Sequence, residues 1–183
     1  MLFLFQATGG TPSPFLLASP IIALLALFVS ITSAIVGFKT LKMQHKHNVL
    51  MVKPIASIEI SDYENSLSVY IRNNGTGPMI INSVTVSSGS ETKNNLIDWM
   101  QDLPVKPVWD FFVTDTAGRS LTSGDEILLL SLKGDDTDQN FVSIRDNCRR
   151  ILRYLSIEVS YTDVYNTPMP IQKRKLSWFD RNL

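Results

Sequence analysis

The chain has 183 residues, with 17 basic and 17 acidic side chains and a single cysteine, Cys148. Zero formal charge gives the chain as a whole no electrostatic reason to bind nucleic acid, and one cysteine excludes an internal disulfide. The length is sufficient for one ordinary domain with its own hydrophobic core beside an N-terminal membrane segment.

The first 38 residues carry no charged side chain, and residues 15–38 are apolar except for Ser, Thr, Gly and one Pro. About 20 apolar residues in a helix cross a bilayer core of roughly 30 Å. No basic residue precedes this run, and it is longer than the apolar region of a signal peptide, so we expect it to be retained as an anchor. The sequence predicts a short extracytoplasmic tail at 1–14 and a transmembrane helix at 15–38.

Residues 39–53 form a basic connector in which helix is predicted to continue to Leu50 and to stop before Pro54. Basic residues beside a span mark its cytoplasmic end and attract anionic headgroups by about 1 kcal/mol each near the surface. We therefore expect the domain from residue 54 to be cytoplasmic. The predicted membrane-surface residues are Lys39, Lys42, Lys46 and Lys53.

Small residues recur along one stripe of the predicted span, at spacings of three and four. Such stripes allow close approach of helices in lipid, which predicts a homo-oligomer through the transmembrane helix or docking on another membrane protein. Ordinary membrane-helix composition is the remaining alternative. The stripe consists of Ala23, Ala26, Ser30, Ser33 and Gly37.

From residue 54 the apolar pattern has a period of two, which is typical of half-buried strands. Strands are predicted at 55–60, 67–72, 79–87, 109–114, 126–132 and 155–161, with residues 171–179 closing the domain. One helix is predicted after a Thr92 cap and ends before Pro104, and a second covers 141–152. The pattern favours an antiparallel β-sandwich with two short helices over 54–183.

The catalytic inventory of this domain is poor. It contains no histidine, which removes a Ser-His-Asp or Cys-His nucleophile pair. Cys148 lies on an apolar helical face, as a packing residue does. The spacing of Asp135, Asp136 and Asp138 resembles the start of a calcium loop, but the sixth-position Gly and the closing Glu are absent. A loop and a helix cap explain these residues better. We expect no catalytic residues, no metal site and no cofactor.

Two basic groups retain functional interest. The arginines of the second helix could form an anion site, because guanidinium groups match phosphate in bidentate geometry; the alternative is a solvated helix face with ion pairs. Residues 173–175, beside Trp178 and Phe179, suit a membrane or partner contact, or an edge strand protected by charge. The candidate anion-site residues are Arg145, Arg149, Arg150 and Arg153.

The order of these features also carries a resemblance: a short tail, one span, a basic connector, Val52-Lys53-Pro54 before a strand, the turn 73–78 (Asn-Asn-Gly-Thr-Gly-Pro), Ser-Gly-Asp-Glu at 123–126 and Tyr-Thr-Asp-Val-Tyr-Asn at 161–166. In this order the chain resembles poorly characterised bacterial single-pass membrane proteins with a cytosolic immunoglobulin-like sandwich. It differs from them at Met79 and at Asn166-Thr167. The resemblance implies the bacterial inner membrane and brings no catalytic residues.

The sequence thus predicts a membrane-tethered, non-enzymatic interaction or sensor module that presents a cytosolic β-sandwich to a partner, with no nucleic acid expected. Its domain from residue 54 has 13 basic and 17 acidic residues. The alternative is a nucleotide-gated membrane effector of a bacterial antiphage defence system, because those effectors are similar in architecture. An enzyme ranks third.

Overall fold

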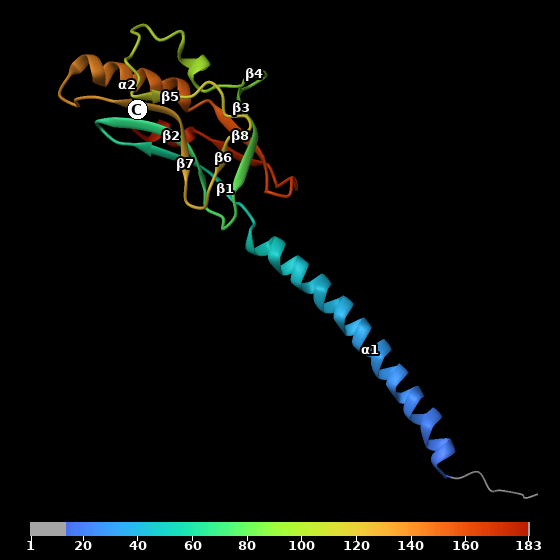
Figure 1. The fold of residues 1–183 in the computed structure, drawn as a ribbon. Helices are drawn as coiled ribbons and strands as arrows, with labels where there is room; N and C mark the ends of the chain where they lie inside the picture. The colour runs from blue at the N-terminus through green and yellow to red at the C-terminus, as the bar shows by residue number, and fades with distance from the viewer. Residues whose placement is uncertain (1–13, 183) are drawn as a thin grey trace, which may run out of the picture. The chain divides into compact units, whose positions relative to one another are not determined.

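The computed structural model describes residues 14–182, and the side chains of residues 20–181. Helix α1 runs from Pro14 to Met51 (Figure 1). Within the described part of the chain, it is the helix that is long and apolar enough to cross a membrane, with a mean hydropathy of 2.6 over its most apolar window. The predicted helix over 15–38 and its predicted continuation to Leu50 are both confirmed. The chain separates into two compact units between Asn48 and Val49, and the predicted tail lies outside the described residues apart from Pro14.

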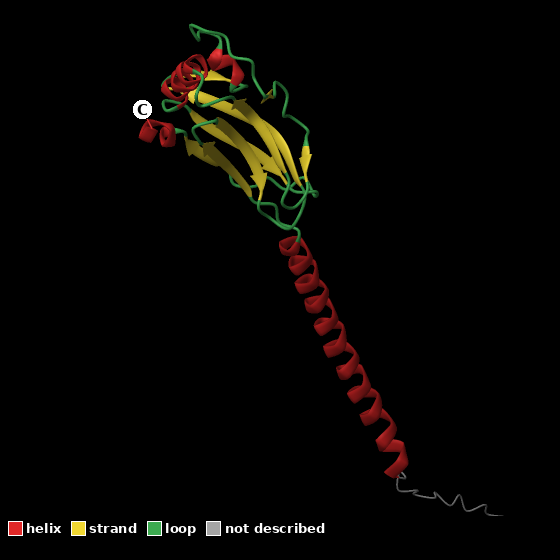
Figure 2. Cartoon of the chain, turned by 90° about the vertical axis from the view of Figure 1, so that its left-hand side faces the viewer, coloured by secondary structure: helices red, strands yellow, loops and turns green. Residues whose placement is uncertain are grey.

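Two antiparallel sheets follow, which confirms the predicted β-sandwich (Figure 2). The first sheet has the order β1-β2-β7-β5 and the second has the order β4-β3-β8-β9, with β6 also paired to β3. The strands of the first sheet are β1 (Ala56–Asp62), β2 (Ser66–Asn73), β7 (Glu126–Lys133) and β5 (Phe111–Phe112). Those of the second are β4 (Glu91–Lys93), β3 (Met79–Ser88), β8 (Ser156–Thr162), β9 (Gln172–Lys175) and β6 (Ser120–Leu121).

The core lies between the sheets and follows the predicted alternation. In β2, Leu67, Val69 and Ile71 are fully buried because side chains two apart share one face of a strand. Ile157 and Val159 of β8 are buried in the same way from the opposite sheet. Helix α2 (Gln139–Leu152) adds Phe141, Cys148 and Leu152 to this core.

The connecting segments differ from the expectation in three places. The predicted helix around 92–103 is a short 3-10 turn, η1 (Ile97–Met100), and Thr92 does not cap it because that residue lies in β4. Strand β5 covers two residues of the predicted 109–114. The predicted closing segment ends in a 3-10 turn, η2 (Ser177–Asn182), whose Phe179 is fully buried.

Candidate functional site

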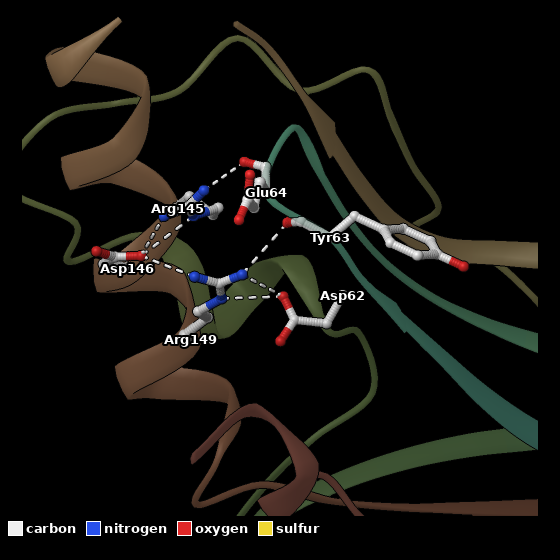
Figure 3. A network of polar contacts seen from close by, with 6 residues as sticks. All are labelled: Asp62, Tyr63, Glu64, Arg145, Asp146 and Arg149. Atoms are coloured by element: carbon white, nitrogen blue, oxygen red, sulfur yellow. Dashed lines mark hydrogen bonds and ion pairs between the residues drawn. The ribbon is translucent and has the colours of Figure 1, made fainter. Parts of the chain in front are cut away.

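Helix α2 positions the predicted arginine row. Asp138 caps its N-terminus by accepting a hydrogen bond from the Asn140 backbone N–H at 2.9 Å, as expected for an aspartate at this position. Phe141, Cys148 and Leu152 face the core, and Arg145 and Arg149 follow each other by one turn next to that face. Their side chains are directed at the turn between β1 and β2 (Figure 3).

Arg149 makes a buried ion pair with Asp62, the last residue of β1. Its Nε and Nη2 atoms donate to the same oxygen, Asp62 Oδ1, at 2.9 and 2.6 Å. The side chains of Arg149 and Asp62 are 4% and 0% exposed. Nη2 also donates to the Tyr63 carbonyl at 3.3 Å, and Nη1 donates to Asp146 at 3.0 Å. The guanidinium is therefore bound on several sides by protein acceptors.

Arg145 completes the network from the next turn of the helix. Its Nη1 donates to the Glu64 carbonyl, and its Nε and Nη2 atoms both donate to Asp146 Oδ1 at 3.1 Å. Asp146 is thus shared by two arginines, while the backbone of the β1–β2 turn accepts from both (Figure 3). The network fastens this turn to α2.

A cleft of about 680 Å³ opens beside the network, lined by Asp62, Tyr63, Glu64, Asn65, Asp136, Arg145 and Arg149. The lining contains three carboxylates and two guanidinium groups, and Asp146, which pairs with both arginines, is a fourth carboxylate beside it. A phosphate would meet an excess of negative charge, and it would have to compete with carboxylates for arginine donors that are already hydrogen bonded. Anion binding here stays a prediction, and this geometry does not favour it.

The other two predicted arginines lie apart from the cleft. Arg150 is exposed and donates to Asn147 at 3.3 Å. Arg153 pairs with Asp180 of η2 at 2.6 Å and lies over the Tyr154 ring, with its side chain 30% exposed. The hydrogen bond to Asp180 is the main cause that raises the pKa of Arg153. The structure therefore brings together Arg145 and Arg149, but not all four arginines.

The alternative interpretation of a solvated helix face with ion pairs is half right. Ion pairs are present at Arg145, Arg149 and Arg153, but Arg145 and Arg149 are buried. The prediction of solvent exposure is wrong for these two residues. Sequence spacing placed them outside the apolar face, whereas the β1–β2 turn packs over that side of α2 and leaves little of either side chain exposed.

The predicted membrane-facing residues all lie on or just after α1. The small-residue stripe of Ala23, Ala26, Ser30, Ser33 and Gly37 is exposed along the helix. Lys39, Lys42 and Lys46 are exposed on its C-terminal half, and exposed Lys53 follows the helix end. The stripe and the basic residues are therefore available for lipid or another helix, and their roles stay predictions.

Helix α2 also holds Cys148, the one cysteine of the sequence. Cys148 is completely buried, and this burial raises the pKa of its thiol to about 12, so a reactive thiolate is suppressed near neutral pH. Within the described range, no group of three or more His, Cys, Asp or Glu side chains is arranged to hold a metal ion.

A second candidate surface was missed at the sequence level. Val105, Val108, Phe111 and Phe112 are exposed on the loop 101–110 and strand β5, and we call these four residues the apolar edge. Val108 is 91% exposed and Phe112 is 47% exposed. The same loop borders a hollow of about 530 Å³ that includes Phe112, and another of about 240 Å³ that includes Val108. The available sequence signal for an exposed apolar loop was the presence of two prolines, at 104 and 107, among apolar residues.

No protein-family model matches the chain, and no curated protein matches it at a significant level.

Proposed function

We propose that this protein is a membrane-tethered, non-enzymatic interaction module whose β-sandwich binds a protein partner through the apolar edge. The observation that carries the proposal is the exposure of Val105, Val108, Phe111 and Phe112 at one sheet edge, beside two hollows. Exposed large apolar side chains that gather on one segment, with polar residues among them, are a feature of protein interaction sites. Lys106, Asp102 and Asp110 supply the polar border here.

The edges formed by β9 and β1 support this choice because charged side chains lie along them. Strand β9 carries Lys173, Arg174 and Lys175, and charged side chains discourage edge pairing. Arg174 also donates to the Ile58 carbonyl, so it links β9 with the neighbouring edge strand β1. Strand β5, by contrast, presents two phenylalanines at the end of its sheet. Main-chain groups of such an edge can pair with an extended partner segment, and adjacent pockets can take its side chains.

The tether is the apolar helix α1. We propose that it spans the bacterial inner membrane once, with the N-terminus outside and the sandwich in the cytoplasm. Support comes from the uncharged run before Lys39 and the four lysines after it. We also propose self-association through the small-residue stripe, or docking of that stripe on another membrane protein.

Site-specific photocrosslinking in native membranes tests the proposed surface. A photoreactive phenylalanine analogue at Phe112 should give a crosslink to a second protein. The same analogue at Trp178 is a matched control, because this exposed aromatic residue has a similar exposed fraction of 46% and lies beside the basic strand β9. A crosslink from Trp178 and none from Phe112 would move the partner site to the basic edge. A partner captured at Phe112 should be lost on Val108→Asp substitution, and its retention would contradict the proposal.

A nucleotide-gated effector receives no specific support from the geometry, because the arginine row does not form one site and its inner members are hydrogen bonded to the protein. Calorimetric titration of the full chain in detergent with cyclic dinucleotides addresses this alternative. Saturable heat that disappears in an Arg150→Gln, Arg153→Gln variant would favour it over the interaction module.

A further inference from the structure

The segment where α1 ends and β1 begins, residues 51–55, is bonded to the loop 73–77. The Thr76 hydroxyl donates to the Met51 carbonyl at 2.5 Å, and the Thr76 backbone N–H donates to the Lys53 carbonyl at 3.2 Å. The Asn74 backbone N–H donates to the Ile55 carbonyl at 2.8 Å. Carbonyls at the C-terminal end of a helix have no partner within it. The loop therefore satisfies one of the carbonyls that the last helical turn leaves open.

The two glycines of this loop are required for close packing and not for an unusual backbone conformation. Positive φ angles occur at Gly89, Gly118, Gly124 and Asn166, but not at Gly75 or Gly77. A Cβ atom on Gly77 would lie 1.8 Å from the Val52 carbonyl oxygen, and one on Gly75 would lie 2.4 Å from the Lys53 carbonyl oxygen. Both obstacles are backbone atoms, so a larger residue would have to displace the segment itself.

Asn73 fixes the loop from inside the sandwich. This side chain is fully buried, and its Oδ1 atom accepts from the backbone N–H groups of Ile55 and Gly75 at 3.2 and 3.0 Å. Its Nδ2 atom donates to the carbonyls of Gly77, Leu121 and Thr122 at 2.7, 3.1 and 3.2 Å. One amide thus joins the segment 51–55, the loop 73–77 and the turn before β7. Buried polar groups with all their partners present hold a single arrangement.

The same hairpin carries the arginine network at its other end. Strands β1 and β2 pair from Ala56 with Asn73 to Asp62 with Leu67. Asn73 therefore lies at the end of the hairpin that receives the chain from α1, and Asp62 lies at the end held by Arg149. The hairpin is fastened to the rest of the sandwich at both of its ends.

We propose that the loop 73–77 is a clamp that locks residues 51–55 onto the sandwich, so that the end of α1 and the β1–β2 hairpin move together. Movement of the hairpin then reaches the last helical turn through hydrogen bonds and packed glycines, in addition to the covalent chain. This coupling device is independent of the proposed partner site, because it uses no residue of the apolar edge.

Hydrogen–deuterium exchange of the full chain in detergent micelles tests the clamp. Gly77→Ala should raise the exchange rate of peptides covering 49–58 and 73–78 by about tenfold or more, as expected when native hydrogen bonds of ordinary net strength open locally. Peptides from β3 and β8 should exchange as in the unmodified chain. Gly89→Asn is the matched control, because Gly89 has a φ of +58°, which Asn tolerates, and open space around its Cβ position.

A second variant, Thr76→Val, keeps the volume and removes the hydroxyl that donates to the Met51 carbonyl. It should raise exchange in residues 49–55 less than Gly77→Ala does, with the sandwich intact. Unchanged exchange at 49–58 in both variants would overturn the clamp. Equal acceleration in every strand would also overturn it, because the loop would then support the whole fold and not the junction.

Discussion

Helix α2 carries three arginines and Arg153 caps its C-terminus, and the inner pair, Arg145 and Arg149, lies in a different environment from the outer pair, Arg150 and Arg153. Arg145 and Arg149 are buried against the β1–β2 turn and donate to its carbonyls and to Asp62 and Asp146. Arg153 pairs with Asp180 at a partly exposed site, and Arg150 is exposed. The inner arginines therefore hold the β1–β2 turn on α2, whereas the outer arginines are surface charges.

The difference arises from what covers each position. The inner arginines lie under residues 62–65, the end of β1 and the turn after it, which come more than 80 residues earlier in the chain. The side chains of Arg149 and Asp62 are almost completely buried, so removal of the guanidinium takes the opposite charge away from a buried carboxylate. The outer arginines remain accessible to water and salt, which weaken their ion pairs. Substitutions along one helix should therefore differ strongly in their effect on stability.

Arg149→Gln should have the largest effect, because it removes one partner of a buried ion pair and leaves Asp62 without its bidentate guanidinium. Breaking such a pair typically costs about 3–5 kcal/mol of unfolding free energy. Chemical denaturation of the full chain in detergent measures this, with fluorescence of the three tryptophans, which all lie in the sandwich unit. A loss below about 1 kcal/mol, the range of exposed pairs, would show that the inner and outer arginines are equivalent.

Arg145→Gln should have an intermediate effect. The variant loses the donor to the Glu64 carbonyl and one of the two arginines that share Asp146. Asp146 keeps Arg149 as a partner and its side chain is 33% exposed, so the remaining charge stays partly solvated. Hydrogen bonds to charged groups contribute about 1.5–3 kcal/mol, and we expect a loss at the lower end of this range. A loss as large as that of Arg149→Gln in the same denaturation experiment would contradict the ranking.

Replacing both partners tests whether the buried pair itself stabilises the fold. The variant Arg149→Met, Asp62→Val removes both charges and fills their place with apolar groups. Exchange of a buried ion pair for packed apolar residues is often close to neutral, so the double variant should recover most of the stability that Arg149→Gln loses. If it is as unstable as the single variant, the hydrogen bonds to Tyr63 and Asp146 account for the stabilisation instead.

The sequence predicted those parts of the fold that depend on local patterns. Alternation in 67–71 identified β2, and the apolar spacing of Phe141, Cys148 and Leu152 identified α2. Strands β4 and β6 were missed because their short segments are held by pairing with β3 and not by a pattern of their own. Thr92 was misread as a cap for the same reason.

The candidate site was predicted in residue identity but not in environment. Arg145 and Arg149 stood out by their spacing, yet nothing near them in the chain indicates that Asp62 is the partner. Asp62 begins the polar segment 62–66, which has the composition of an ordinary turn. The apolar edge was missed because exposed and buried apolar residues look alike in sequence. Phe112 is distinguished from core residues only by its place on the edge strand β5, and Val108 only by its place in the loop before that strand.

Arg153→Gln should have the smallest effect on stability. The variant loses the ion pair with Asp180 and the contact over the Tyr154 ring, both at a partly exposed site where water replaces the lost partner. We expect the denaturation midpoint to stay close to that of the unmodified chain, and any small shift to disappear in high salt because exposed pairs are screened. Arg150→Gln is the control, since Arg150 forms only a hydrogen bond to Asn147 among the contacts described for it. A salt-independent loss of unfolding free energy in Arg153→Gln, absent in Arg150→Gln, would contradict this ranking. It would show that Arg153 holds η2 on α2 as strongly as the inner arginines hold the β1–β2 turn.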